Sequence, residues 1–597
     1  MALMKGYVFF LLFLCSISVA LAATKVETAD HVVVNSADWQ DVYSAVEYAN
    51  LQNMPSNFLS SSAHGPVLPF AIPKDRSVVV FSSQRNPYIV GYRTVLENFG
   101  FDVQELSLSS MNLDLARRLT SVNKYIVVDG AYGYNAISVA SYAAIDDYYV
   151  LFANERNARS VESFLASKNS QSVIIYGQVD ARVKTALARF NPEYINTGDR
   201  FQNNIEIVKR YLQKKPTRQV VLSNGEFIEN GIVSGADPVL FVGRGNVPDQ
   251  IKTFIKDSNI DVAILIGNEL IGSATTVRRE IGVSVFVKFA QGARTPSGPV
   301  TTVEDLDRFP MPSYVLDLQL YTILYNKATN TLEVTFKNNV DIGTFLKSTI
   351  RINAGDQTFI VGDADVQFID KNQYKTFLYT TTTDGKPLLL ESDTANGSID
   401  TIFGESRGSL EFRLQGNFQV SYISVLDDTK LTIENVAYDR LRHMFLVTVK
   451  NIGEIDTYVF AEMQDVIVNG EPSLLASTEE LLAPGKNKVL EIPAVLSDQD
   501  VADNQLVRTK AYYGARQNSL IKTTYAEFAF AFARLDIILY ILIILVLLLL
   551  ALFIFGRKKC PDCKHKNPPF ARKCKKCGAL LRGHRRHHGH KEHEKKA

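Results

Sequence analysis

The sequence predicts a multidomain protein with three α/β (parallel-sheet) repeat units, two immunoglobulin-like β-sandwiches, one transmembrane helix and a C-terminal zinc ribbon. Three observations predict this architecture. A short apolar run recurs three times at equal spacing, a block of alternating strand patterns recurs twice, and two CxxC pairs follow a long charge-free run. The chain has 597 residues, of which 46% are hydrophobic and 21% charged, so it has a globular composition and is too long for one hydrophobic core.

The first residues have the form of a secretory signal peptide. Lys5 supplies the positive charge, Tyr7–Ala20 supplies the apolar segment, and Ala20-Leu21-Ala22 is a small-residue cleavage site. We therefore expect residues 1–22 to be removed from the mature protein. An uncleaved membrane anchor is the alternative.

The run Ile537–Phe555 contains no charged residue. A bilayer core of about 30 Å is crossed by about 20 apolar residues in a helix, so the run has the length of one span. The alternative, a buried core helix, would usually keep a polar stripe. Arg557, Lys558 and Lys559 follow the run directly, which places the C-terminal end in the cytoplasm and the N-terminal part outside.

The charged residues and the cysteines are both distributed unequally on the two sides of the run Ile537–Phe555. The formal net charge of +1 combines an acidic part before the run with a basic part after it. Such a basic segment is attracted to anionic lipid or to nucleic acid, although it can also serve only to orient the span. Of the five cysteines, Cys15 lies in the signal peptide and the other four follow the run, so the expected ectodomain has no disulfide. This pattern favours a prokaryotic surface protein, and we expect an archaeal source.

The α/β units are predicted from strands that recur at a spacing of ninety-four residues. These strands are His31–Ser36, Tyr125–Gly130 and Gln219–Asn224, and an amphipathic helical pattern follows each of them. Short continuous apolar runs that alternate with such helices are typical of parallel strands buried on both faces. Each copy is therefore expected to be a small α/β layer with right-handed crossovers.

A polar residue recurs early in each of these helices, at Asp41, Asn135 and Glu229. We regard the three as candidate ligand-binding residues. The alternative is that each caps its helix or interacts with the helix dipole.

Further along each copy, Tyr149–Phe152 corresponds to Pro238–Phe241, and two later strands end in Gly177 and Gly267. These segments, with the polar helix starts, resemble the cell-wall-binding repeat (type 2) of bacterial and archaeal surface proteins over residues 28–291. The resemblance implies three α/β units packed together that attach a surface protein to an anionic wall polymer. An acidic ectodomain would repel such a polymer at low salt.

The sequence does not favour an enzyme. The glycine-rich turn Gly243-Arg244-Gly245 lacks the third glycine of a dinucleotide fingerprint, and Pro248 is typical of a helix start. The expected ectodomain contains only His31, His64 and His443, in different segments, so no Ser-His-Asp arrangement is indicated.

Beyond a turn-rich linker, alternation replaces helical periodicity. Leu332–Phe336 and Phe445–Val449 are corresponding strands of a second repeat, 113 residues apart. Each block shows about seven short strand patterns separated by turn signals, as in immunoglobulin-like sandwiches. The VTVKNIGE segment resembles the V-x-N-x-G strand of adhesion-type sandwiches in prokaryotic surface proteins, which implies a stalk. Asn396 lies in a glycosylation sequon, on an expected loop.

The strongest chemical signal is a pair of CxxC motifs, formed by Cys560, Cys563, Cys574 and Cys577. Two such pairs at this spacing form a four-thiolate zinc site, and four protein ligands make it structural rather than catalytic. The segment Cys560–Leu581 resembles the short zinc ribbon at the termini of many prokaryotic membrane proteins. In this chain, Lys564 replaces a glycine of that pattern and Lys573 an aromatic residue. The resemblance implies a folded adaptor.

The last residues hold five histidines among lysines and arginines, which suit metal, RNA or phospholipid headgroups; the alternative is a disordered basic tail. The predicted domains are a signal peptide (1–22), α/β units (28–118, 119–215, 216–291), a linker (292–311), β-sandwiches (312–424, 425–528), a transmembrane helix (535–555), a zinc ribbon (556–581) and this tail (582–597).

From these parts we expect a membrane-anchored, non-enzymatic surface protein. It is a surface-layer or envelope component, or an adhesion or wall-glycan-binding head on a stalk. The expected partners are the membrane, an envelope polymer or further copies in a lattice, and a cytoplasmic protein at the ribbon, but no specific nucleic acid. The alternative is a single-pass receptor whose head binds a ligand and whose ribbon recruits a cytoplasmic partner. An ectodomain hydrolase lacks residues to carry its chemistry.

Overall fold

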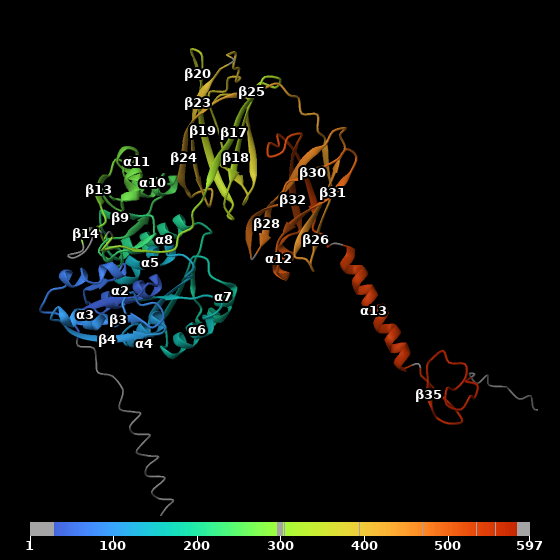
Figure 1. The fold of residues 1–597 in the computed structure, drawn as a ribbon, viewed down its shortest axis with the longest axis horizontal. Helices are drawn as coiled ribbons and strands as arrows, with labels where there is room; N and C mark the ends of the chain where they lie inside the picture. Colours follow the sequence, from blue (N-terminus) through green and yellow to red (C-terminus); the bar gives the residue numbers. More distant parts are fainter. Residues whose placement is uncertain are drawn as a thin grey trace, which may run out of the picture. The chain divides into compact units, whose positions relative to one another are not determined.

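A computed structural model describes residues 29–294, 302–303, 305–392, 394–468, 470–532, 534–555 and 557–581 (Figure 1). The predicted signal peptide and the His-rich tail lie outside the described residues. The chain divides into two compact bodies. One holds the α/β units and the first sandwich, and the other holds the second sandwich, the following helix and the cysteine-rich segment.

The first α/β unit is a parallel sheet of four strands in the order β2-β1-β3-β4. The strand β1 is buried throughout, as its continuous apolar run predicts. The elements of this unit are β1 (His31–Asn35), α2 (Trp39–Leu51), β2 (Ser56–Phe58), β3 (Ser77–Ser83), α3 (Tyr92–Asn98), β4 (Asp102–Leu108) and α4 (Met111–Arg118).

The other two units repeat this topology, in the orders β6-β5-β7-β8 and β11-β9-β12-β13. The second unit contains β5 (Lys124–Val128), α5 (Tyr134–Ile145), β6 (Tyr148–Phe152), α6 (Ala158–Ser167), β7 (Ser172–Tyr176), α7 (Ala181–Leu187), β8 (Glu193–Ile195) and α8 (Arg200–Lys214). The third contains β9 (Gln219–Ser223), β10 (Phe227–Ile228), α9 (Asn230–Val233), β11 (Val239–Phe241), α10 (Asp249–Asp257), β12 (Val262–Ile266), α11 (Ile271–Thr276) and β13 (Ser284–Lys288). The prediction of repeated parallel α/β sheets is confirmed.

The helices that open the three units pack against one another. In each unit this helix follows the first strand of its sheet: α2, α5 and α9 contact one another pairwise. The Tyr43 hydroxyl of α2 donates to the carbonyl oxygen of Ala136 in α5, at 2.9 Å and out of contact with solvent. The units therefore surround a shared helical core, and we call the three together the head.

Side-chain amides close the outer edge of each sheet. Asn112 of α4 donates to the Val150 carbonyl of β6 and accepts from the Phe152 N–H. Asn204 of α8 makes the same pair of bonds to the Val239 carbonyl and the Phe241 N–H of β11.

The outer edge of the first unit's sheet, at β2, is closed by a side chain of the third unit. Asn230 of α9 donates to the Ser56 carbonyl of β2 at 2.7 Å. Each unit thus closes the sheet of the next, and the third closes the sheet of the first. A strand edge in the interior would otherwise leave backbone groups unpaired, at a cost of about 1–3 kcal/mol for each group.

Part of the predicted linker 292–311 packs against the head. The short strand β16 (Phe309–Pro310) pairs with β10, and Phe309 is buried against Phe58 and Tyr88. The Met311 N–H donates to the Glu226 carbonyl. This segment is therefore a strap over the third unit as well as a connection, which its turn-rich composition did not indicate.

The first sandwich has two sheets, β22-β18-β17-β25 and a second of β20-β19-β23-β24 with β21 beside β19. Its strands are β17 (Leu318–Asn326), β18 (Thr331–Asn338), β19 (Thr344–Ala354), β20 (Gln357–Gly362), β21 (Gln367–Ile369), β22 (Tyr374–Tyr379), β23 (Asn396–Gly404), β24 (Leu410–Gln419) and β25 (Ser421–Ile423). Asn396, expected on a loop, is the exposed first residue of β23.

This sandwich is joined to the head by a buried polar contact. Asp199 caps the N-terminus of α8 and also accepts hydrogen bonds from Ser406 and Ser409, on the turn between β23 and β24. Arg200 forms ion pairs with Glu405 and Glu411. The head and the first sandwich therefore meet through specific buried groups.

The glycine-rich turn of the head lies at this contact. A Cβ atom at Gly243 would stand 2.3 Å from the carbonyl oxygen of Glu411, so only glycine allows β24 to approach. Gly243 and Gly245 therefore serve domain packing, in agreement with the absence of a complete dinucleotide fingerprint.

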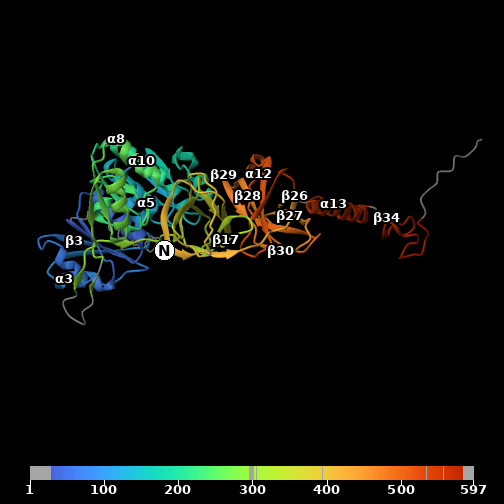
Figure 2. The ribbon, with the colours of Figure 1, turned by 90° about the horizontal axis from the view of Figure 1, so that it is seen from above.

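The second sandwich has the sheets β26-β27-β31 and β29-β28-β32-β33, with β30 beside β28 (Figures 1 and 2). Its core contains residues of both sheets. Its elements are β26 (Leu431–Asp439), β27 (Met444–Asn451), β28 (Thr457–Val468), β29 (Glu471–Ala476), β30 (Glu480–Leu482), β31 (Asn487–Pro493), α12 (Asp498–Asp503), β32 (Leu506–Gly514) and β33 (Lys522–Ala529).

The two sandwiches repeat the same internal bonds. Asn338 and Asn451 are fully buried, and each donates to the carbonyl oxygen four residues later, Ile342 or Ile455. The Lys-Asn pair that ends the second strand of each sandwich, at 337–338 and 450–451, therefore fixes the turn that follows that strand.

The helix α13 (Arg534–Phe555) follows the second sandwich, and the structure describes its side chains from Tyr540 to Ala551. Among the described residues, no helix meets the length and apolarity required of a membrane span. The predicted span at 535–555 is therefore not confirmed.

We predict that Asn204→Leu lowers the thermal midpoint of the head. The change leaves the Val239 carbonyl and the Phe241 N–H without partners, at a cost of about 1–3 kcal/mol for each. Scanning calorimetry of the full chain measures the effect, with Gln202→Leu on the same helix as control. Equal midpoints for the two variants would contradict the role of this amide.

Candidate metal centre

The four predicted zinc ligands lie on two similar turns. In the first turn, the Lys564 N–H donates to the Cys560 carbonyl, and in the second, the Gly578 N–H donates to the Cys574 carbonyl. Lys564 and Gly578 both adopt positive φ, 58° and 74°. The residue after the second cysteine of each turn therefore has a left-handed backbone conformation. Glycine adopts this conformation without strain, whereas Lys564 does not.

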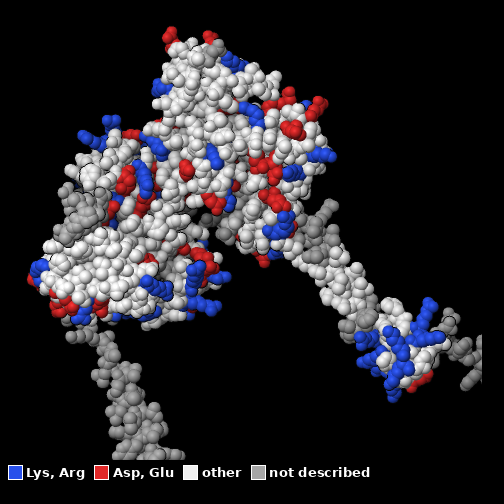
Figure 3. Space-filling model, in the orientation of Figure 1, with Lys and Arg blue, Asp and Glu red and all other residues white. Residues whose placement is uncertain are grey.

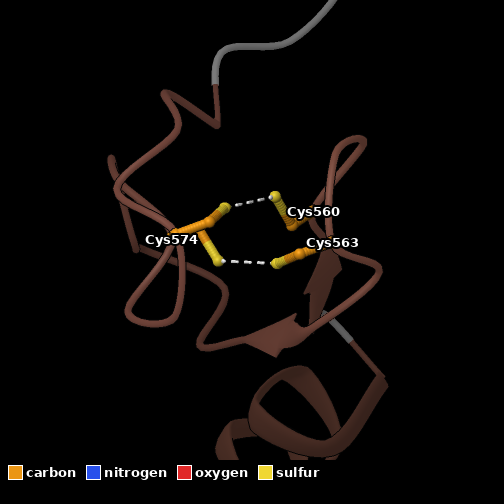
Figure 4. A group of neighbouring side chains, drawn as sticks. Cys560, Cys563 and Cys574 are labelled. Atoms are coloured by element: carbon orange, nitrogen blue, oxygen red, sulfur yellow. Dashed lines mark hydrogen bonds between the residues drawn. The ribbon is translucent and has the colours of Figure 1, made fainter.

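The structure brings the four sulfur atoms together. All lie within 4.8 Å of one another, and the Cys560–Cys577 and Cys563–Cys574 Sγ pairs are each 3.5 Å apart. Figure 4 shows Cys560 and Cys563 facing Cys574 across the centre. A tetrahedron with Zn–S bonds of about 2.3 Å has sulfur–sulfur edges of about 3.8 Å, so the group fits a metal ion such as zinc.

A side chain outside the CxxC motifs supports these turns. Asn567 is fully buried, donates to the His565 carbonyl at 2.9 Å and approaches the Cys574 Sγ at 3.5 Å. Its Oδ1 accepts from the Lys575 N–H, so it connects the two turns. Sequence reasoning did not single out this residue, although it lies within the segment Cys560–Leu581 that resembles the zinc ribbon and matches an asparagine of that pattern.

Backbone donors also favour the thiolate form of one ligand. Burial acts to raise the pKa of Cys574, but the N–H groups of Cys577 and Lys576 outweigh it and lower that pKa to about 6. The N–H of Ala579 acts to lower the pKa of Cys577, but side-chain hydrogen bonds with Cys563 and Cys560 outweigh it and raise that pKa to about 12, so zinc must displace a proton from the second cysteine of this turn.

The candidate head residues lie at the carboxyl ends of their own sheets. Asp41 accepts a hydrogen bond from Ser36, at the end of β1, and burial raises the pKa of its carboxyl. The cap of α2 is Asp38 instead, whose side chain accepts from the Gln40 N–H. Asp41 therefore connects its helix to the end of the strand.

Asn135 packs against Gly177, the residue that follows β7. A Cβ atom at Gly177 would stand 2.7 Å from the Asn135 Nδ2, and this glycine has a φ of 72°. A glycine is therefore favoured at this position for two reasons. Its backbone has a positive φ, and the side chain of Asn135 leaves no room for a Cβ atom.

Glu229 stands just before α9 but makes no side-chain cap. It pairs with Lys288 at the end of β13, and burial raises the pKa of its carboxyl. Among the described contacts, none joins Glu229, Asn135 and Asp41 to one another. Each contacts groups within its own unit, and whether they bind a ligand stays a prediction.

The comparisons with known proteins assign this chain to no family. The sequence matches no family model, and no curated protein matches it. Among solved structures, the cell-wall protein Cwp6 from Clostridium difficile is 12% identical, with a TM-score of 0.33 over 44% of this chain and 41% of that one.

Two further solved structures are similar over part of the chain. The CupB2 chaperone of Pseudomonas aeruginosa is 10% identical, with a TM-score of 0.12 over 36% of this chain and 100% of that one. A tandem repeat from the extending region of a large adhesion protein is 10% identical, with a TM-score of 0.14 over 40% of this chain and 55% of that one. Since the similarity to Cwp6 covers 41% of that protein, this chain spans less than half the length of Cwp6.

We predict that the full chain, purified from cells, carries one zinc ion and that Cys574→Ser removes it. A site with three thiolates lacks one of the four vertices of the tetrahedron and therefore binds zinc far more weakly. Elemental analysis by mass spectrometry measures the stoichiometry, with Ser519→Ala as a control that leaves the cysteines intact. Zinc bound equally by the Cys574→Ser variant would contradict the assigned ligands.

We predict that Lys564→Gly tightens zinc binding roughly fivefold. Relief of a left-handed non-glycine residue is worth about 1 kcal/mol, and folding of so small a unit is coupled to the metal. Competition with a zinc chelator measures the affinity. Lys576→Gly removes the same charge from the other turn without relieving a positive φ, so it should not tighten binding.

Proposed function

We propose that this protein is a non-enzymatic cell-surface protein. The head and the two sandwiches face outward, α13 holds the chain in the cell membrane, and the cysteine-rich segment lies in the cytoplasm as a zinc ribbon. The head contacts an envelope polymer, neighbouring copies or another cell, as a surface-layer or adhesion protein does. The prokaryotic, archaeal source and the signal peptide belong to the same proposal.

The observation that carries this proposal is the surface of α13. From Tyr540 to Leu550 every large side chain is apolar and between 46% and 64% exposed. A helix that is apolar all round is stable only when another apolar phase surrounds it. The charge-free sequence continues from Ile537 to Phe555, the length of one bilayer crossing.

Charge and cysteine usage support the orientation. Arg557, Lys558 and Lys559 follow the helix, as the positive-inside rule requires of a cytoplasmic end. The four metal-site cysteines lie on the same side, where a reducing compartment keeps thiols available for zinc.

The environment of the polar head residues supports a non-enzymatic role. Asp41 accepts a hydrogen bond from Ser36, and Glu229 pairs with Lys288 through Oε1, whereas the Glu229 Oε2 is buried without a hydrogen-bond partner. The strap at Phe309 packs against the head, and the buried junction at Arg200 joins the head to the first sandwich.

A single-pass receptor is the second candidate. One residue, Gly556, separates α13 from the first described residue of the ribbon segment, so a folded cytoplasmic module stands directly at the end of the helix. Such a module suits recruitment of a cytoplasmic protein after a ligand binds the head.

We predict that protease added to intact cells removes a head epitope and spares an epitope at the C-terminus. The membrane should protect everything after α13. Immunoblotting of the membrane fraction before and after detergent measures both epitopes, and detergent should expose the second. Release of the chain by alkaline carbonate, or loss of both epitopes on intact cells, would contradict the proposal.

Cryo-tomography with an antibody to the head separates the two candidates. A regular array of labelled heads supports an envelope component. Sparse labelling, with a cytoplasmic partner that is lost on Cys574→Ser while the head stays intact, supports the receptor.

A further inference from the structure

We propose that the zinc-ribbon segment, residues 557–581, lies on the anionic lipid surface beside α13. In this arrangement Phe570 and Leu580 enter the headgroup region while lysines contact lipid phosphates. The inference rests on the proposed function, because it requires α13 to cross the membrane.

The segment carries a large unneutralised charge. Asp562 is its only acidic residue, and none of its basic side chains forms an ion pair among the described residues. Figure 3 shows lysines and arginines gathered over this segment. The basic residues are Arg557, Lys558, Lys559, Lys564, Lys566, Arg572, Lys573, Lys575 and Lys576.

Two of these lysines stand directly opposite each other. Lys559 of β34 (Lys558–Lys559) is the pairing partner of Lys566 in β35 (Lys566–Asn567). Like charges at opposite positions of an antiparallel pair destabilise it. An anionic surface that contacts both lysines relieves this repulsion.

Two large apolar side chains of the segment are left outside its core. That core is formed by Cys560, Cys574 and Leu581, with Cys563, Ala571 and Ala579 packed against it. In contrast, Phe570 is 87% exposed and Leu580 is 63% exposed.

These apolar groups lie among basic ones. Leu580 pairs with Lys573 across the second turn, and Phe570 lies two residues before Arg572 in the sequence. Apolar tips surrounded by lysine and arginine are the composition of interfacial lipid-binding surfaces. The two side chains therefore match the boundary between headgroups and acyl chains.

Proximity makes lipid the favoured partner. Gly556 alone separates the end of α13 from Arg557, so the segment stays close to the membrane surface. Attraction to anionic lipid extends over a Debye length of about 8 Å at physiological salt. Single-stranded nucleic acid, in contrast, is usually bound by several aromatic residues in succession, and Phe570 is the only aromatic residue here apart from His565.

The test uses the full chain with zinc in lipid nanodiscs. Trp39 is the only tryptophan, so Trp39→Phe combined with Phe570→Trp places a single reporter on the ribbon. In nanodiscs with anionic lipid we expect blue-shifted emission that brominated lipid quenches. In zwitterionic nanodiscs, or near 1 M salt where the Debye length is about 3 Å, we expect the quenching to decrease.

Charge reversal supplies the matched variants. Lys559→Glu and Lys566→Glu should each weaken attachment at least about fivefold, judged by the anionic lipid fraction needed for quenching. Lys430→Glu and Lys486→Glu, exposed in the second sandwich, should leave it unchanged. Removal of residues 582–597 should also preserve the quenching, because the proposal assigns it to the ribbon.

The outcomes are distinguishable. If the chain does not enter nanodiscs, the membrane anchor is wrong and this inference falls with it. If the chain enters anionic nanodiscs and the reporter is not quenched, only this inference is overturned. A single-stranded RNA that shifts the emission in zwitterionic nanodiscs, without lipid quenching in anionic ones, would replace lipid by nucleic acid as the partner.

Discussion

The head depends on the closure of three open sheet edges. The second strand of each parallel sheet has no strand on its outer side, and an unpaired backbone group in the interior costs about as much as a lost hydrogen bond. Asn112, Asn204 and Asn230 supply the missing partners from a neighbouring unit. Because a primary amide offers both a donor and an acceptor, one side chain can replace part of a strand. No unit is therefore complete without its neighbours, which explains why three small sheets form one head.

The contact at Arg200 extends this order into the first sandwich. The guanidinium is buried, pairs with Glu405 and Glu411, and lies 4.1 Å from the ring of Tyr134. Such a buried pair contributes little net stability compared with apolar packing, but removing one partner leaves an uncompensated charge. Its main effect is to select one arrangement of the head and this sandwich. Movement of the head relative to the first sandwich would require several buried polar bonds to break together.

The features that could be predicted from the sequence are those marked by a hydrophobic pattern, by a repeat or by a fixed spacing between residues of one type. Strands such as Val32–Val34 are continuous apolar runs and were recognised, and the corresponding strands Leu332–Phe336 and Phe445–Val449 revealed the sandwich repeat. The fourth strands were missed because an edge strand such as β4 is half exposed and shows no continuous run. Asn204 was missed because an asparagine in a helix is ordinarily a surface residue, and its role depends on a strand thirty-five residues away. The cysteines were found from spacing alone, whereas Asn567 acts through geometry that spacing does not encode.

The ribbon segment shows how a small core leaves residues available for other contacts. Its core holds little beyond three of the cysteines, Leu581 and two alanines, so a metal ion bound by the four thiolates would supply most of the energy that folds it. A core this small cannot cover Phe570 or Leu580, and no carboxylate among the described residues neutralises its lysines. In water the lysines are well hydrated, whereas Phe570 and Leu580 leave apolar surface exposed. In the proposed arrangement beside α13, whose described side chains from Tyr540 to Leu550 are also exposed, both features suit a single partner, since a membrane offers an apolar interior and an anionic surface a few ångströms apart.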